Sequence, residues 1–233
     1  MFVAALSAVP HVGCSDNSGN KSKNAVDPGA PTPLETIARL TELRKEGRYD
    51  AMRPYIVPER AGDVVVTLVA VQDFLNANEQ LCALVRQKIG PGLAATIDQG
   101  HHAYRLGIFS RSVELLDGVI DGNSAVVTFT VDGQLPARTA ELRVVGGQWC
   151  YDPGPGDATR LAKAFTMMAD GLRKVAGELK SDRVDIEKMR TDPESLAKLV
   201  AAHLKAGVQM IPPPPIGSND EQPQTPTASN PAP

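Results

Sequence analysis

SVELLDGVIDGNSAVVTFTVDGQLPARTAELRVVGGQWCY, residues 112–151, is the stretch that decides the fold. Its apolar and polar residues alternate with the period of a half-buried strand. One face of the central strand carries Ala125, Val127, Phe129 and Val131, and the other carries Val126, Thr128 and Thr130. Gly122-Asn123 and Gly146-Gly147 tolerate positive φ, so each closes a hairpin. Pro136 predicts a wider connection over 132–138. We expect an antiparallel meander ending at Trp149 and Tyr151.

Helical patterns precede the meander. Thr32-Pro33-Leu34-Glu35 is a capping box, and the helix that it starts should end at Gly47. A short helical turn is expected over 48–55, interrupted at Pro54 and Pro58. A long amphipathic helix is expected over 63–88, followed by a short helix over 93–99. The positions on the inward side of the long helix recur three and four residues apart: Val64, Leu68, Val71, Leu75, Asn78, Cys82, Val85 and Ile89.

Two further helices are expected after the meander. Asp157 caps a helix whose apolar seam runs from Leu161 to Leu179, and Asp192 caps a last helix that ends near Gly207. The seam is shorter than three heptads, which favours packing on the sheet or on the first helices over a coiled-coil dimer. The predicted fold class is therefore α+β, with N-terminal helices packed on a curved, cone-like antiparallel meander sheet and two C-terminal helices after it.

This order of elements resembles the nuclear transport factor 2-like superfamily, also called cystatin-like or ketosteroid-isomerase-type. The resemblance covers residues 34–151 and is carried by Val113-Glu-Leu-Leu, by Asp121-Gly-Asn-Ser-Ala-Val-Val and by the segment from Glu141 to Tyr151. It implies helices folded over a bent sheet to form a cone with an apolar pocket. The C-terminal helices after Asp157 are not required by that family.

Composition limits the possible partners. The net charge of −3 and the 4% content of aromatic residues offer neither electrostatic attraction nor stacking platforms for nucleic acid. A chain of 233 residues with Pro-rich ends suggests one domain with one core.

The N-terminus resembles a bacterial lipoprotein signal. An uncharged apolar run reaches Cys14 and is followed by a polar segment, although His11 stands where a lipobox favours Leu and no basic residue precedes the run. We therefore expect Cys14 to be lipidated and the protein to be exported to the cell envelope or periplasm, with a cytoplasmic protein as the alternative. No later apolar run reaches the roughly 18 residues needed to span a bilayer, so attachment would be through lipid.

The expected organisation has five parts. Residues 1–14 are the export or lipoprotein signal and 15–31 a flexible tether. Residues 32–155 form the helix-plus-meander domain, 156–210 the helical extension, and 211–233 a disordered Pro-rich tail with polyproline character.

Candidate chemistry is sparse. By resemblance to ketosteroid isomerase, Asp73 or Asp98 would pair with Tyr104 or Tyr55, but nothing in their spacing singles one out, and no catalytic residue is assigned. The histidine pair His101-His102 lacks partners at metal-site spacing, so no metal is assigned. His203 lies near an apolar helix face and is expected to be a satisfied core or boundary histidine.

The glycine-rich turn over 154–159 lacks a P-loop lysine, so Asp157 is interpreted as a cap and no cofactor is assigned. Cys82 and Cys150 are expected to be free thiols, with a disulfide between them as the alternative; alternation places Cys150 outward, opposite Trp149 and Tyr151.

Three functional hypotheses remain open. The first is a non-catalytic, lipid-anchored envelope protein that binds a small apolar ligand or a protein partner. The second is a lyase or isomerase with a pocket in the cone. The third is a scaffold that recruits partners through its Pro-rich tail. A homodimer is a further possibility, and nucleic acid is not an expected partner.

Overall fold

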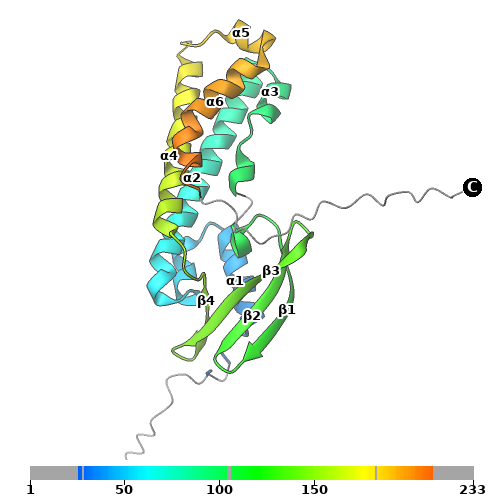
Figure 1. The fold of residues 1–233 in the computed structure, drawn as a ribbon, viewed down its shortest axis with the longest axis vertical. Coiled ribbons are helices and arrows are strands. Elements are labelled where there is room, and N and C mark those ends of the chain that lie inside the picture. Colours follow the sequence, from blue (N-terminus) through cyan, green and yellow to red (C-terminus); the bar gives the residue numbers. More distant parts are fainter. Residues whose placement is uncertain (1–25, 28, 104–105, 182, 212–233) are drawn as a thin grey trace, which may run out of the picture.

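The computed structural model describes residues 26–27, 29–103, 106–181 and 183–211. Helices come first, a sheet follows, and further helices close the order (Figure 1), which confirms the predicted α+β class. The sheet lies at one end of the molecule, and most of the helices form a bundle at the other. Cys14 and the tail from Pro212 lie outside the described residues.

The sheet is the predicted antiparallel meander. It comprises β1 (Val113–Asp121), β2 (Ser124–Val131), β3 (Gln134–Val145) and β4 (Gln148–Asp152), in that spatial order, and it is not closed. The turns before β2 and β4 form at the predicted glycines, where Gly122 has a φ of 56° and Gly147 a φ of 84°.

The connection between β2 and β3 is tighter than predicted. Asp132 and Gly133, with φ values of 54° and 66°, form a two-residue turn, so the expected wide loop over 132–138 is wrong. A two-residue turn with positive φ at both positions matches the twist of the flanking strands. Pro136 lies inside β3, beside a shift in register between Phe129 and Val131, where its missing N–H breaks no regular ladder.

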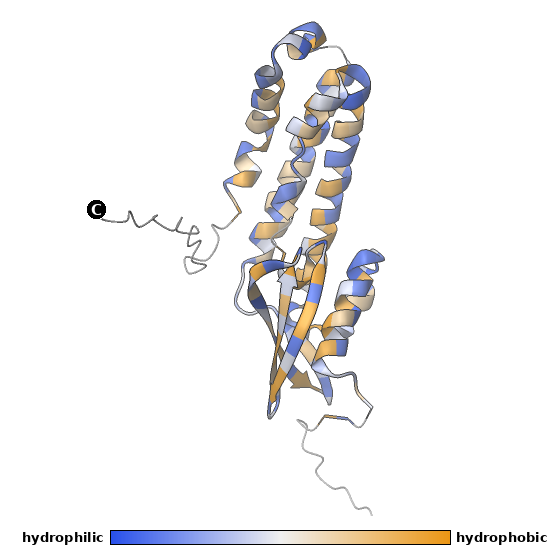
Figure 2. Ribbon diagram, turned by 90° about the vertical axis from the view of Figure 1, so that its right-hand side faces the viewer, coloured by the Kyte–Doolittle hydropathy of each residue, from blue (hydrophilic) through white to orange (hydrophobic). Residues whose placement is uncertain are grey.

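The first helices cover one face of the sheet, which we call the inner face. They are α1 (Pro33–Lys45) and the 3-10 helix η1 (Tyr49–Tyr55). The capping box is confirmed, since the Thr32 backbone N–H donates to Glu35 Oε2 at 2.7 Å and the Glu35 N–H donates to Thr32 Oγ1. Figure 2 shows the apolar side of α1 turned toward the strands.

The long helix α2 (Pro58–Lys88) begins earlier than the predicted start at Asp63. Pro58 does not interrupt helical structure but begins the helix, because proline is tolerated at the first helical position. α3 (Pro91–Thr96) and the 3-10 helices η2 (Gly100–Ala103) and η3 (Gly107–Phe109) connect α2 to the sheet.

Two hydrophobic cores lie along α2, so the expectation of a single core is wrong. At its 31 residues α2 is about 46 Å long, enough to span both. The sheet-side core joins α1, η1 and the first half of α2 to the inner face; its fully buried members include Ile37, Leu40, Met52, Leu68, Val127 and Phe129. The bundle core joins the second half of α2 to the C-terminal helices; it includes Phe74, Leu81, Phe165, Leu172, Val175 and Leu196.

The C-terminal helices are α4 (Ala158–Lys180), the short α5 (Ile186–Thr191) and α6 (Pro193–Val208). The seam of α4 packs on α2 and α6 and belongs to the bundle core rather than to the sheet. Helices α2 and α4 run parallel, because the rings of Phe74 and Phe165 meet with centroids 5.4 Å apart and, about four turns further along both helices, Lys88 Nζ donates to the Leu179 carbonyl at 2.8 Å. This confirms the expected packing on the first helices.

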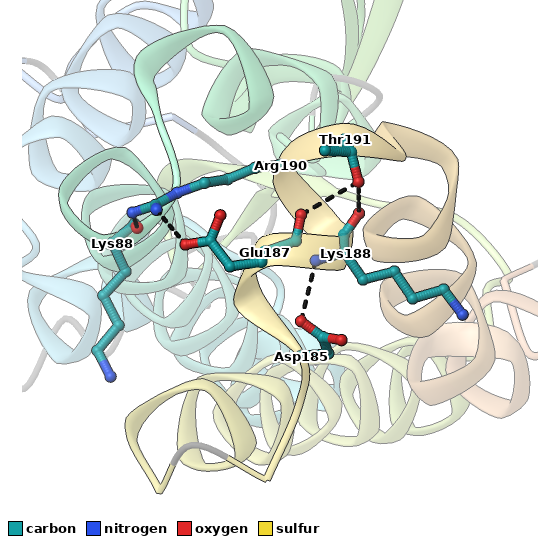
Figure 3. A network of polar contacts seen from close by, with 6 residues as sticks. All are labelled: Lys88, Asp185, Glu187, Lys188, Arg190 and Thr191. Carbon is teal, nitrogen blue, oxygen red and sulfur yellow. Dashed lines mark hydrogen bonds and ion pairs between the residues drawn. The ribbon is translucent and has the colours of Figure 1, made fainter.

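Because α2 and α4 run parallel, their C-termini lie together at the tip of the bundle, where the partial negative charges of the two helix ends repel. Lys88 crosses to α4, and Arg190 Nη2 donates to the Lys88 carbonyl at 2.8 Å while it also contacts Glu187 (Figure 3). Thr191 and Asp185 close the ends of α5 through hydrogen bonds to backbone groups. This network supplies cations and donors where the helix termini need them.

Candidate functional site: the outer edge of the sheet

The two acids proposed by resemblance lie in different surroundings. Asp73 is a surface residue of α2 paired with Arg173 of α4. Asp98 lies beyond α3, where its Oδ1 accepts from Asn78 Nδ2 at 2.7 Å and from the Gly100 N–H at 2.8 Å. Both acids are thus held by structural partners.

Of the two proposed donors, the structure describes Tyr55 but not Tyr104. Tyr55 packs against the sheet-side core, while Asp98 is bonded to the second half of α2. Tyr104 lies outside the described residues. Within the described residues, Tyr55 is therefore not brought together with either acid, and the pairing with Tyr104 stays a prediction.

The histidines have local partners. The ring centroids of His101 and His102 lie 4.1 Å apart, with the ring planes tilted by 37°. Burial is the larger cause that lowers the pKa of His102, and the charge of His101 is the smaller one. No cluster of three or more His, Cys, Asp or Glu suited to a metal occurs in the described part of the chain. His203 Nε2 lies 3.3 Å from Glu178 Oε1 at the boundary of α4 and α6, as expected of a boundary histidine.

A shallow groove follows this helix boundary. It has a volume of about 220 Å³ and is lined by Met167, Asp170, Gly171, Lys174, His203, Ala206 and Gly207. Gly171 allows α4 and α6 to approach closely here. A Cβ at this position would lie only 2.6 Å from the His203 carbonyl oxygen. The groove is thus the boundary between the packed helices α4 and α6, and it lies away from the sheet.

Asp157 has the role predicted for it. Its side chain accepts from the Arg160 N–H at 2.8 Å and caps α4. A carboxylate already occupies this helix N-terminus, which leaves it unsuited to a phosphate.

Both described cysteines are free, as predicted. Burial raises the pKa of the Cys82 and Cys150 thiols, which disfavours the reactive thiolate. The outward position predicted for Cys150 is wrong, because its side chain is 4% exposed. It does point away from Trp149, but Pro54 of η1 covers that side of β4, and Cys150 Sγ lies 3.6 Å from the Pro54 carbonyl oxygen.

Exposed apolar residues gather instead on the free edge of the sheet. The β1 residues Leu116, Val119 and Ile120 are 51%, 64% and 56% exposed, and Val126 of β2 lies opposite Val119. Figure 2 shows α1 along one face of the strands. On the opposite face, Pro54 of η1 contacts Cys150 of β4 and Glu59 of α2 pairs with Arg143 of β3. We call the solvent side of β1 and β2 the outer edge.

Three acids of β1, Glu114, Asp117 and Asp121, share the outer edge with Val119 and Val126, whereas Ile120 lies opposite Ala125 on the inner-face side. They lie opposite Thr130, Thr128 and Ser124 of β2, and all three are exposed. None of the three makes an ion pair with a described residue. The sequence pattern did not predict a site at these acids. The signal that could have found them is that residues 113–121 contain three acids and no basic residue.

Comparison of the chain with protein-family models, curated proteins and solved structures finds no match. The resemblance to nuclear transport factor 2-like proteins therefore stays a prediction. No helix in the described residues has the length and apolar character to cross a membrane.

Proposed function

We propose that this chain is a non-catalytic exported protein that a lipid on Cys14 holds at the cell envelope, and that it binds a protein partner through the outer edge of its sheet. The anchor is supported by the apolar run before Cys14 and the polar segment after it. Asp27, near the end of the predicted tether, is bonded to the sheet, because its N–H donates to the Gly147 carbonyl at 2.8 Å on the β3–β4 turn.

The inner face of the sheet is filled by buried side chains, and this is the observation that favours a protein partner over a small apolar ligand. Phe129 and Val127 are 2% and 0% exposed, and α1 and the first half of α2 occupy the space that a cone-bound ligand would need. Close-packed interiors of this kind leave few voids larger than a water molecule. Among the exposed apolar residues, those of β1 and the neighbouring Val126 form a group on adjacent strands, and grouped exposed apolar residues mark interaction sites.

Metabolic labelling with palmitate in the native host tests the anchor. The wild-type protein should take up label and fractionate with membranes, whereas Cys14→Ser should do neither. An unlabelled wild-type protein in the cytosol would refute the proposal. Mass spectrometry of an organic extract of the protein tests the choice of partner, since a stoichiometric small molecule would favour the ligand hypothesis instead.

A further inference from the structure

The two edges of the sheet differ in their backbone pairing. At the β4 edge the Val57 N–H donates to the Tyr151 carbonyl at 3.0 Å, and Ile56 forms a parallel bridge to Tyr151. The chain thus covers that edge itself. At the β1 edge no other element of the described chain adds backbone hydrogen bonds along Val113–Asp121. A nine-residue strand that no other strand pairs with on this side is a template for another strand. One of its edge groups, the Gly118 N–H, donates to Asp117 Oδ1 at 2.7 Å, and an added strand would have to displace this local bond.

The acids of β1 also have no cation partner in the described residues, whereas several acids of the helices do. Acids of the helices pair with nearby cations, as Asp73 does with Arg173 and Glu187 with Arg190. Glu114, Asp117 and Asp121 have no such partner in the described residues, and their positions opposite Thr130, Thr128 and Ser124 place them on one face. The outer edge therefore presents one line of negative charge.

This charge argues against a second copy of the chain as the occupant. If two β1 strands paired antiparallel with Val119 opposite its copy, which keeps outer-face residues opposite one another, Asp117 would lie opposite Asp121 at both ends. Like charges directly opposite one another destabilise a strand pair. The complementary partner has the opposite sign.

We propose that the β1 edge adds an extended segment of a partner protein in which basic residues alternate with apolar ones. Side chains alternate between faces along a strand, and the bulge between Leu115 and Asp117 returns Asp117 to the face of Glu114, so the basic residues would meet Glu114, Asp117 and Asp121 on the outer face. The apolar residues would cover Ile120, which lies opposite the buried Ala125 on the inner-face side. The inference rests on the proposed function and specifies the chemistry of its partner.

A synthetic peptide tests this strand addition. The probe is a nine-residue, end-capped peptide of alternating Lys and Val, titrated into the full chain and followed by amide hydrogen exchange. A second peptide has the same sequence with backbone N-methylation at alternate residues, which keeps its charge but prevents pairing. We expect saturable binding of the first peptide only, with slowed exchange confined to β1.

A matched pair of variants separates the edge from general attraction. Glu114→Gln combined with Asp117→Asn removes two charges from β1, and Asp63→Asn combined with Glu79→Gln removes two from exposed positions of α2. The β1 variant should bind about tenfold more weakly and the α2 variant as wild type, since exposed charge pairs contribute up to about 1 kcal/mol each. Unchanged circular dichroism will show that both variants fold.

Two results would overturn the inference. Absence of binding would mean that the acids only protect the edge from aggregation. Equal binding of the N-methylated peptide, or equal loss in both variants, would mean charge attraction without strand addition. Either result leaves palmitate labelling of Cys14 unaffected, whereas an unlabelled cytosolic protein would refute the proposed function whatever the peptide does.

Discussion

Asn78 Nδ2 donates a 2.7 Å hydrogen bond to Asp98 Oδ1, and Asn78 Oδ1 accepts from the Gln99 N–H at 3.0 Å. Through this one side chain α2 holds the segment that leads back to the sheet. Asn78 is 7% exposed, so the groups that it satisfies cannot readily turn to water.

Asn78→Ala should lower the free energy of unfolding by about 1–3 kcal/mol, because it leaves buried polar groups without partners. Urea denaturation measures the loss. Asn76→Ala is the control on the same helix, since Asn76 only accepts an exposed bond from Gln72. Equal values for the two variants would mean that the Asn78 network contributes nothing specific.

Gly171→Ala should separate α6 from α4. The new Cβ would lie 2.6 Å from the His203 carbonyl oxygen, and backbone cannot yield as a flexible side chain does. We expect a loss of at least about 1 kcal/mol, in line with overpacked cores, and faster amide exchange in α6. Gly177→Ala on the same helix meets no atom within 4 Å and should stabilise by about 0.5–1 kcal/mol. Stabilisation by both would refute the close helix contact.

Tyr151 makes stability depend on alkaline pH. Burial, assisted by the charge of Asp152, raises the pKa of Tyr151 from 10.0 to about 12. The contribution of the buried, neutral Tyr151 to the free energy of unfolding is complete below pH 10. It is lost as pH rises toward 12, because Tyr151 ionises at a lower pH in the unfolded chain than in the folded protein. The loss should be on the order of 2–3 kcal/mol. Denaturation of Tyr151→Phe across that range should show a smaller decline than wild type, and parallel curves would contradict the assignment.

Thr32→Ala should cost about 1 kcal/mol, because the capping box of α1 is lost. Thr41→Ala, on the same helix, removes only an exposed bond to the Ala38 carbonyl and should be neutral or slightly stabilising. Thermal unfolding of the two variants compares them directly. A Thr32→Ala protein as stable as Thr41→Ala would show that the cap is dispensable.

The sequence predicted those features that depend on local chemistry. Glycines that need positive φ marked two of the three hairpins, the capping box marked the start of α1, and Asp157 marked the start of α4. Asp132-Gly133 was as strong a turn signal as the others, but Pro136 was given more weight. A register shift in β3 that tolerates the proline cannot be seen in one strand alone.

Features that depend on packing were predicted less well. An apolar seam on α4 is equally consistent with a sheet or a helix as its partner, and only the structure shows α2 in that place. Strand alternation placed Cys150 on the correct side but could not reveal that Pro54 covers it. The outer edge was missed because the acids of β1 form a site only if that strand is an unpaired edge, which is a property of the whole sheet.

Photo-crosslinking in the native host tests the central claim most directly. A photoreactive amino acid replaces Val119 on the outer edge or, in the comparison, Val69 on the exposed side of α2, which is 49% exposed. The account predicts a discrete protein adduct at Val119, diminished by the Lys–Val peptide, and none at Val69. Adducts at Val69 alone, adducts at Val119 that the peptide leaves unchanged, or no adduct at either position would contradict it.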